Sequence, residues 1–226
     1  MSLNLLIGKN NSLANYVARQ LNNIVPAEGV ESDERLLLPF INPALLRIHP
    51  ILNSVRAFNP SEFNHFNSLQ YATFLYLLAN QCWQEEGENE LSDRLFCLNR
   101  ALNSIDLFYS VKMPEIFFIS HGLGTVLGAA SYGERCVFFQ NVTVGRVGER
   151  RPSIGSEVVI YPGAMVTGDS IIGDGCVIAA GSIINNKVIP KNMMVRMHEG
   201  KLLIAEKKFE YIDLYYRDFI FKAICS

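Results

Sequence analysis

Among the four histidines of this 226-residue chain, His121 has the surroundings that most favour chemistry. It lies beside Gly122 and Gly124, at a point where the spacing of a repeated pattern breaks. Imidazole titrates near neutral pH, so a histidine placed in this way is a candidate general base. Structural or surface roles account for the other three histidines, which are His49, His65 and His198.

The element that must position His121 is a repeat in which an aliphatic residue recurs at every sixth position. The series is Ile154, Ile160, Val166, Ile172, Ile178 and Ile184. Nearby glycines supply the turn conformations that side chains forbid. Short strands joined by tight corners at a constant interval wind into a solenoid with its aliphatic residues stacked inward. An ordinary sandwich of short strands would not predict this constant spacing. The pattern therefore predicts a parallel β-helix.

The rest of the chain divides around this repeat. The six-residue step extends upstream through Tyr132, Phe138 and Val144, and the step from Val144 to Ile154 is ten. Four extra residues are therefore expected to project as a surface loop, where solenoids often bind ligands. We expect a helical N-terminal domain at residues 1–104, the β-helix at 105–195 and a helical tail at 196–226. Three prolines within residues 33–52 predict short helices and turns there.

Composition excludes several classes of protein. A formal net charge of −2, without a basic run, argues against nucleic acid as a partner. No apolar stretch reaches transmembrane length, and the first residues do not have the pattern of a signal peptide. The five cysteines are scattered without metal-ligand spacing, so we expect no metal site. A reducing cytoplasm is the expected location.

The six-residue repeats resemble the left-handed β-helix of the hexapeptide acyltransferases. Residues 100–190 resemble the serine O-acetyltransferase branch, which includes relatives from bacterial polysaccharide gene clusters. The blocks "SHGLGTVLG", "FFQNVTVG" and "ERRPSIG" carry this resemblance, because serine acetyltransferases have similar stretches in the same order. The resemblance implies acetyl-CoA as co-substrate. It also implies a homotrimer, or a dimer of trimers, with active sites in clefts between subunits.

The resemblance also assigns site residues. His121 matches the catalytic base of the family, and Asp106, fifteen residues earlier, matches the carboxylate that orients this base. Glu115 is a local competitor for that second role. A backbone N–H at Gly145 or Arg146 matches the donor to the oxyanion. The corner residues that match the coenzyme-binding positions are Gly145, Pro162, Gly163, Ala180 and Gly181.

Three departures from the family bear on the acceptor. Ser120 replaces an aspartate that helps to hold the amino acid, Arg151 replaces a histidine, and the loop that carries Arg150 is shorter. A neutral hydroxyl beside two arginines suits a sugar better than free serine. The sequence therefore predicts an O-acetyltransferase that acts on a sugar of a bacterial surface polysaccharide, such as capsule or O-antigen, or on its precursor.

Three alternatives to this prediction stay open. The first is a serine O-acetyltransferase of cysteine biosynthesis. The second is N-acetylation of an amino sugar, since one base and one coenzyme groove can also serve an amine. The third is a non-catalytic solenoid that acts as an assembly subunit, against which the retention of His121 with Asp106 argues.

Overall fold

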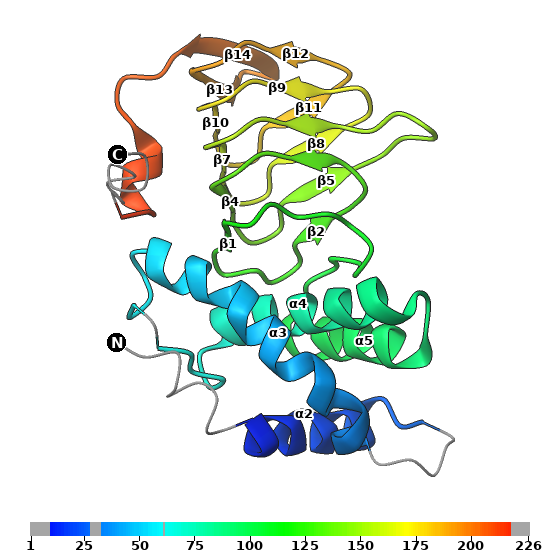
Figure 1. Cartoon of the computed structure of the whole chain (residues 1–226). Helices are drawn as coiled ribbons and strands as arrows, with labels where there is room; N and C mark the ends of the chain where they lie inside the picture. The colour runs from blue at the N-terminus through cyan, green and yellow to red at the C-terminus, as the bar shows by residue number, and fades with distance from the viewer. Residues whose placement is uncertain (1–9, 28–32, 61, 218–226) are drawn as a thin grey trace, which may run out of the picture.

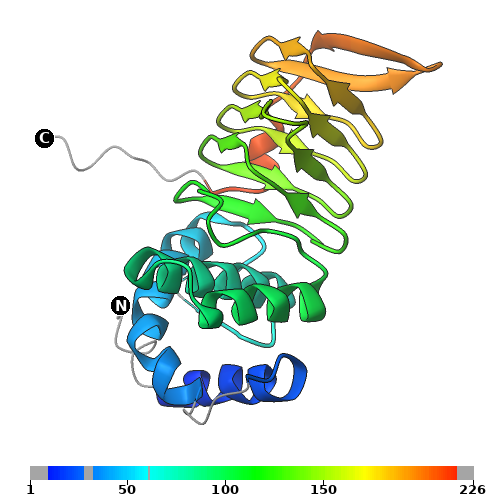
Figure 2. The same cartoon turned by 90° about the vertical axis from the view of Figure 1, so that its right-hand side faces the viewer.

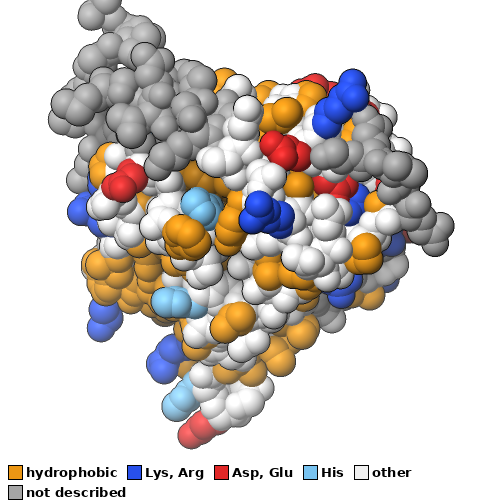
Figure 3. All heavy atoms as spheres, turned by 90° about the horizontal axis from the view of Figure 1, so that it is seen from below, with side chains coloured by type: hydrophobic (Ala, Val, Ile, Leu, Met, Phe, Trp, Pro, Cys, Tyr) orange, Lys and Arg blue, Asp and Glu red, His pale blue; other side chains and the backbone are white. Residues whose placement is uncertain are grey.

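The computed structural model describes residues 10–27, 33–60 and 62–217, and it places a helical part beneath a stack of short strands (Figure 1). The described helices of the N-terminal part are α2 (Asn10–Ile24), α3 (Asp33–Ser54), α4 (Ser68–Glu86) and α5 (Glu90–Asn103). Helices α4 and α5 lie next to the strands, and α2 lies farthest from them (Figures 1 and 2). Viewed from this helical end, apolar side chains are interspersed with charged ones (Figure 3). None of the described helices combines the length and apolar composition needed to cross a membrane.

Helix α3 is one continuous helix, so the short helices and turns expected from its prolines are wrong. Pro39, Pro43 and Pro50 lie inside it, and each lacks a backbone N–H for the helical ladder. Packing offsets this loss, because one face of the helix is buried in the core along its whole length. The large buried aliphatic residues of α3 are Leu37, Ile41, Leu45, Ile48, Ile51 and Leu52.

The strands form four coils, each with three short strands, and they stack into three parallel sheets. The first sheet contains β1 (Phe117–Ile119), β4 (Cys136–Phe138), β7 (Val159–Ile160) and β10 (Val177–Ile178). The second contains β2 (Val126–Leu127), β5 (Thr143–Gly145), β8 (Met165–Thr167) and β11 (Ile183–Asn185). The third contains β3 (Ser131–Tyr132), β6 (Ser153–Ile154), β9 (Ile171–Ile172) and β12 (Val188–Ile189). The predicted left-handed parallel β-helix is confirmed.

The aliphatic series of the sequence forms the interior of the solenoid. Each residue of the series from Ile154 to Ile184 is at most 2% exposed. They stack in register between coils, as Ile160 does on Ile178 and Val166 on Ile184. We call the corner between the first and second sheets the first edge, and the corner between the second and third sheets the second edge.

The C-terminal tail differs from the helix expected for residues 196–226. Strand β13 (Met193–His198) continues the first sheet, and β14 (Lys201–Glu206) pairs with it antiparallel. Figure 2 shows this hairpin projecting beyond the stack at its far end. Strand β13 pairs with β10 of the last coil, and β14 satisfies the backbone groups on the free side of β13, so the hairpin ends the first sheet. One short 3-10 helix follows at Tyr211–Leu214, and residues 218–226 lie outside the described part.

After this 3-10 helix, residues 215–217 join the outer face of the first sheet to the end of α3; we call them the strap. Tyr215 packs against Phe139, with ring centroids 5.6 Å apart, and its hydroxyl lies 2.9 Å from that of Tyr161. Tyr216 is fully buried and forms an isolated antiparallel bridge with Val55. The strap therefore covers part of the outer face of the first sheet with this chain's own residues.

The guanidinium of Arg217 in the strap caps the end of α3. It donates to the carbonyl of Val55 at 2.6 Å and to that of Asn53 at 3.0 Å. A helix end leaves carbonyl groups without intrahelical partners, and a cation there also complements the helix dipole. The strap thus fixes the helical part relative to the solenoid.

Candidate active site

His121 lies on a two-residue bulge at the first edge. In the first coil the chain advances seven residues between the first and second sheets, from 119 to 126. In the next coil it advances only five residues between the paired positions, from 138 to 143. The hydrogen bonds between the first and second coils identify the extra residues. Just before the bulge, Ser120 N–H donates to Phe138 O, and just after it, Asn141 N–H donates to Leu123 O. His121 and Gly122 therefore lie outside the regular corner.

The backbone of this bulge is unusual. His121 has φ of 51°, in the left-handed region, and its carbonyl accepts the N–H of Leu123 at 2.7 Å. Gly122 is required here, because a Cβ at this position would lie 2.5 Å from the side chain of Ile105. Residues held in such conformations cluster at functional sites, where the surrounding structure fixes them. The bulge makes the imidazole an exposed group at the edge of a rigid solenoid.

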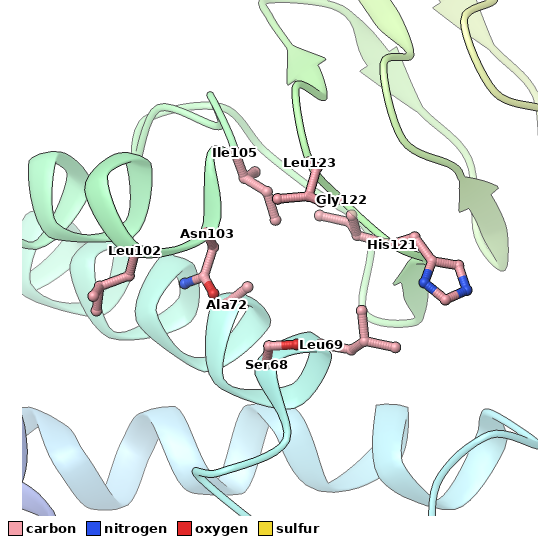
Figure 4. A pocket seen from close by; sticks show the side chains of 10 residues that line it. Ser68, Leu69, Ala72, Leu102, Asn103, Ile105, His121, Gly122 and Leu123 are labelled. Carbon is pink, nitrogen blue, oxygen red and sulfur yellow. The ribbon is translucent and has the colours of Figure 1, made fainter.

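Helix α5 and the first coil hold the bulge from below. Ser104, which follows α5, accepts the N–H of Gly124 at 2.9 Å. A small cavity of about 190 Å³ lies between the helices and the bulge. Figure 4 shows the His121 ring at one end of this cavity, with Leu102 and Asn103 at the other. The cavity is lined by Ser68, Leu69, Ala72, Leu102, Asn103, Ile105, Ile119, His121, Gly122 and Leu123.

Four of the predicted coenzyme-binding residues lie on the first edge, above His121. Gly181 N–H donates to Pro162 O at 2.9 Å, and Gly163 N–H donates to Gln140 O at 3.1 Å, so the corners stack directly. No atom of the described part of the chain lies within 4 Å of where a Cβ of Gly181 would be. Together with Ala180, these residues form an open track of small corners that leads away from the imidazole.

Asp106 lies at the base of the second sheet. It forms an isolated parallel bridge with Val126, and its N–H donates to Thr125 O at 2.9 Å. Its carboxylate is 3.5 Å from Nε of Arg100, and both side chains are substantially exposed. Among the described residues no hydrogen bond joins this carboxylate to His121. Glu115, the other candidate for the carboxylate that orients His121, lies before β1. Its backbone N–H donates to the Glu134 carboxylate at 3.1 Å.

Ser120 does not lie with His121 on the open surface. It is only 6% exposed, and it lies just before the bulge at the edge of the first sheet. The residue in the same position of the next coil is Phe139, whose ring is covered by Tyr161 and Tyr215. A side chain buried in this way gives little information about the acceptor.

The remaining predicted residues lie on the second edge. Gly145 ends β5, and the chain then leaves the coil at exposed Arg146. The four extra residues form a tight turn in which Val147 and Arg150 exchange two backbone hydrogen bonds, of 3.0 and 3.2 Å. Arg150 lies 3.8 Å from Asp169, and Arg151 is exposed. Within one chain, the predicted site residues are therefore divided between two edges.

One polar group at the first edge was not singled out from the sequence. The amide oxygen of Gln140 is buried and has no hydrogen-bond partner among the residues that the structure describes. The sequence placed Gln140 in the block "FFQNVTVG", but only the packing of the coils shows that its amide is unsatisfied.

Comparisons with known proteins agree with this geometry. Residues 151–186 match the family described as bacterial transferase hexapeptide (six repeats). The chain is 35% identical to the serine acetyltransferase of Synechococcus elongatus over 92 residues, which are 38% of each chain. It is 32% identical to that of Bacillus licheniformis over 135 residues, which are 54% of this chain and 62% of the relative. The chain thus spans less than two thirds of the length of these curated relatives.

Solved structures are similar over most of the chain. A serine acetyltransferase from Brucella abortus superposes with a TM-score of 0.65 at 19% identity, covering 89% of this chain and 85% of the other. A serine acetyltransferase in complex with CoA gives a TM-score of 0.65 at 20% identity, covering 85% and 84%. At such identities these superpositions show the shared fold, including the helical part. The resemblance inferred from the sequence is confirmed.

These comparisons overturn the prediction of a sugar acceptor and of polysaccharide biosynthesis. The curated relatives named above are serine acetyltransferases. The prediction depended strongly on Ser120, which the fold buries. A departure at a buried position is weak evidence about a ligand, which explains the error.

Proposed function

We propose that this protein is a serine O-acetyltransferase, which transfers the acetyl group of acetyl-CoA to the hydroxyl of L-serine. The observation that carries the proposal is the exposed His121, held on a bulge of the β-helix in a chain that is similar in sequence to serine acetyltransferases. The same similarity argues against a non-catalytic assembly subunit.

In this proposal His121 is the general base. Its neutral imidazole takes the proton of the serine hydroxyl as the oxygen attacks the thioester carbonyl. The tetrahedral intermediate then collapses, the bond from carbon to sulfur breaks, and the imidazolium returns the proton to the leaving thiolate. The products are O-acetylserine and CoA. The exposure of His121 at the edge of the solenoid favours this role, because substrates can reach the imidazole there.

Asp106 is proposed to support the imidazolium from the adjacent sheet. Its carboxylate contacts only Arg100 by ion pairing within the described residues, at 3.5 Å and largely exposed, so that contact is weak and exchangeable. Closure of the site around substrates would allow the carboxylate to face the ring instead. A carboxylate in this role orients the imidazole and stabilises its charged form.

The acyl donor is proposed to lie along the first edge. The corners at half-buried Pro162 and at exposed Gly163, Ala180 and Gly181 offer backbone groups without bulky side chains, in line above His121. A flexible thioester arm needs such an open track for close approach to the backbone. This placement brings the thioester to the imidazole at the base of the track.

The two-edge arrangement favours a homotrimer in which neighbouring subunits complete each site. The proposed oxyanion donor at Gly145 or Arg146 and the cations Arg150 and Arg151 lie on the second edge, away from His121 of the same chain. Packing of one subunit's second edge near the next subunit's first edge would bring them together. The arginines would then bind the carboxylate of serine. Free thiols at Cys82, Cys97, Cys136 and Cys176 suit a reducing cytoplasm, where we place the enzyme.

The test is release of free thiol from acetyl-CoA by the purified full-length protein. We expect turnover that depends on L-serine and yields O-acetylserine by mass spectrometry. D-Serine and L-alanine serve as controls, since the first tests stereochemistry and the second lacks the hydroxyl. Thiol release at the same rate with and without L-serine would reject the proposal.

A further inference from the structure

The cavity of about 190 Å³ beneath the His121 bulge lies between the start of α4, the end of α5 and the first coil. Most of the residues that line it are aliphatic, and none of its described lining residues is Asp, Glu, Lys or Arg. The aliphatic ones are Leu69, Ala72, Leu102, Ile105, Ile119 and Leu123. Such a lining suits an uncharged apolar group and not the zwitterion L-serine, whose two charges would lack partners there.

The apolar lining reaches the candidate base itself. Gly122 allows the side chains of Ile105 and Ile119 to pack directly against the bulge, because a Cβ at this position would lie 2.5 Å and 2.8 Å from them. The next residue, Leu123, also lines the cavity, although it is 63% exposed. Apolar side chains therefore lie beside His121 at its end of the cavity (Figure 4).

The cavity continues the line of the track proposed for the coenzyme. The corners at Gly163 and Gly181 stack above the His121 bulge, and the helices lie below it (Figure 1). A thioester that reaches the imidazole along these corners presents its sulfur from above. The acyl group, on the other side of the thioester carbonyl, then points toward the helices, where the cavity lies.

We propose that this cavity receives the acyl chain of the donor, and that the enzyme uses thioesters longer than acetyl-CoA, with butyryl-CoA as a good donor. The inference rests on the proposed function. A methylene group is about as large as a water molecule, whose share of liquid volume is about 30 Å³. The two extra methylenes of a butyryl group therefore need about 60 Å³. The cavity supplies this space.

The chemistry is the same as for acetyl transfer. The serine oxygen forms a bond to the acyl carbon, the bond from carbon to sulfur breaks, and His121 carries the hydroxyl proton to the leaving thiolate. The products are O-butyrylserine and CoA. Each methylene that leaves water for an apolar cavity improves binding by up to about fourfold, so the cavity favours the longer donor.

The first experiment compares donors on the wild-type protein at saturating L-serine. KM for butyryl-CoA is expected to be about fivefold lower than KM for acetyl-CoA. Decanoyl-CoA should be a poor donor, because its eight extra methylenes need about 240 Å³, which is more than the cavity holds. A kcat/KM for butyryl-CoA about a hundredfold below that for acetyl-CoA would overturn the proposal.

The second experiment fills the cavity. Ala72→Leu adds three carbons at a residue of α4 that lines the cavity and is 4% exposed. It should lower kcat/KM for butyryl-CoA at least about tenfold more than for acetyl-CoA. Ala101→Leu, the same substitution at an exposed position of α5, is the matched control and should change neither value. If Ala72→Leu does not fold, Ser68→Phe at the exposed start of α4 fills the cavity from its rim and should show the same selectivity.

Other results would also overturn the proposal. Equal losses with both donors in the filled variants would show that the acyl chain lies elsewhere. A change in KM for L-serine alone would assign the cavity to the acceptor, and a fall in the mass of the assembly would assign it to a neighbouring subunit.

Failure of the proposed function is distinguishable from failure of this inference. Wild-type protein without serine-dependent turnover on any donor would reject the proposed function. Calorimetric titration without serine still tests the cavity. Tighter binding of butyryl-CoA than of acetyl-CoA, lost in Ala72→Leu, would support the acyl site, and equal binding of the two donors by the wild type would reject it.

Discussion

The hydroxyl of Tyr216 donates a hydrogen bond of 2.9 Å to the carbonyl of Cys136, across 80 residues of sequence. Tyr216 is fully buried against the first sheet, so this bond joins the strap to β4. Through Arg217 the same strap holds the end of α3. One short segment thus connects the solenoid, the helical part and the tail.

Removal of this hydroxyl should destabilise the protein. Tyr216→Phe leaves the Cys136 carbonyl buried without its donor, at a cost of about 1–3 kcal/mol. Tyr216→Ala also creates a cavity and should cost about 3–5 kcal/mol. Urea unfolding followed by circular dichroism measures both changes. Arg196→Met, an exposed substitution on the β13–β14 hairpin, is the control. Equal stability of Tyr216→Phe and wild type would show that the strap does not contribute.

Stability should fall in alkaline solution. Burial raises the pKa of Tyr216 well above its usual value of 10, and it raises the pKa of Tyr76 to about 12. The unfolded chain then loses these protons at a lower pH than the folded protein. The stabilisation is complete below about pH 10 and is lost as pH rises beyond it. Urea midpoints at pH 8 and 11 measure this loss. The loss of stability between pH 8 and pH 11 should be smaller in Tyr76→Phe than in the wild type. An equal wild-type midpoint at the two pH values would contradict the prediction.

His121→Ala should lower serine-dependent turnover by about a hundredfold or more, the scale of a lost general base. Binding of CoA should change little, because the open corners above the bulge remain. Asp106→Asn should give a smaller loss, since the ring stays but its charge support weakens. His198→Ala, on the exposed hairpin, is the control. Thiol release measures the turnover of all three variants. Near-wild-type turnover of His121→Ala would exclude His121 as the base.

Assembly should depend on the second and third sheets. Ile183 on the second is 56% exposed, and Val188 on the third is 66% exposed, whereas the strap covers part of the first sheet. A ring trimer needs two different surfaces on each subunit, and these two faces supply them. Ile183→Lys should therefore reduce the mass measured by light scattering from trimer to monomer and abolish turnover. Ile24→Lys, on α2, should leave the trimer intact. A monomeric wild type with full activity would contradict the shared site.

The six-residue spacing by itself determined the solenoid, because each coil contacts only its neighbours. A pattern repeated along the sequence therefore specifies a pattern repeated in space. It placed Ile154 and its successors inside, and the broken spacing marked His121 for attention.

Tertiary structure decided what depends on contacts between distant residues. The continuity of α3 through three prolines comes from its buried face. The form of the tail comes from the unpaired last coil and from the bond between Tyr216 and Cys136. The division of the site between two edges, the burial of Ser120 and the unsatisfied oxygen of Gln140 arise from how the coils stack. Local propensity carries no information about such partners, because their sequence separation exceeds any periodic pattern.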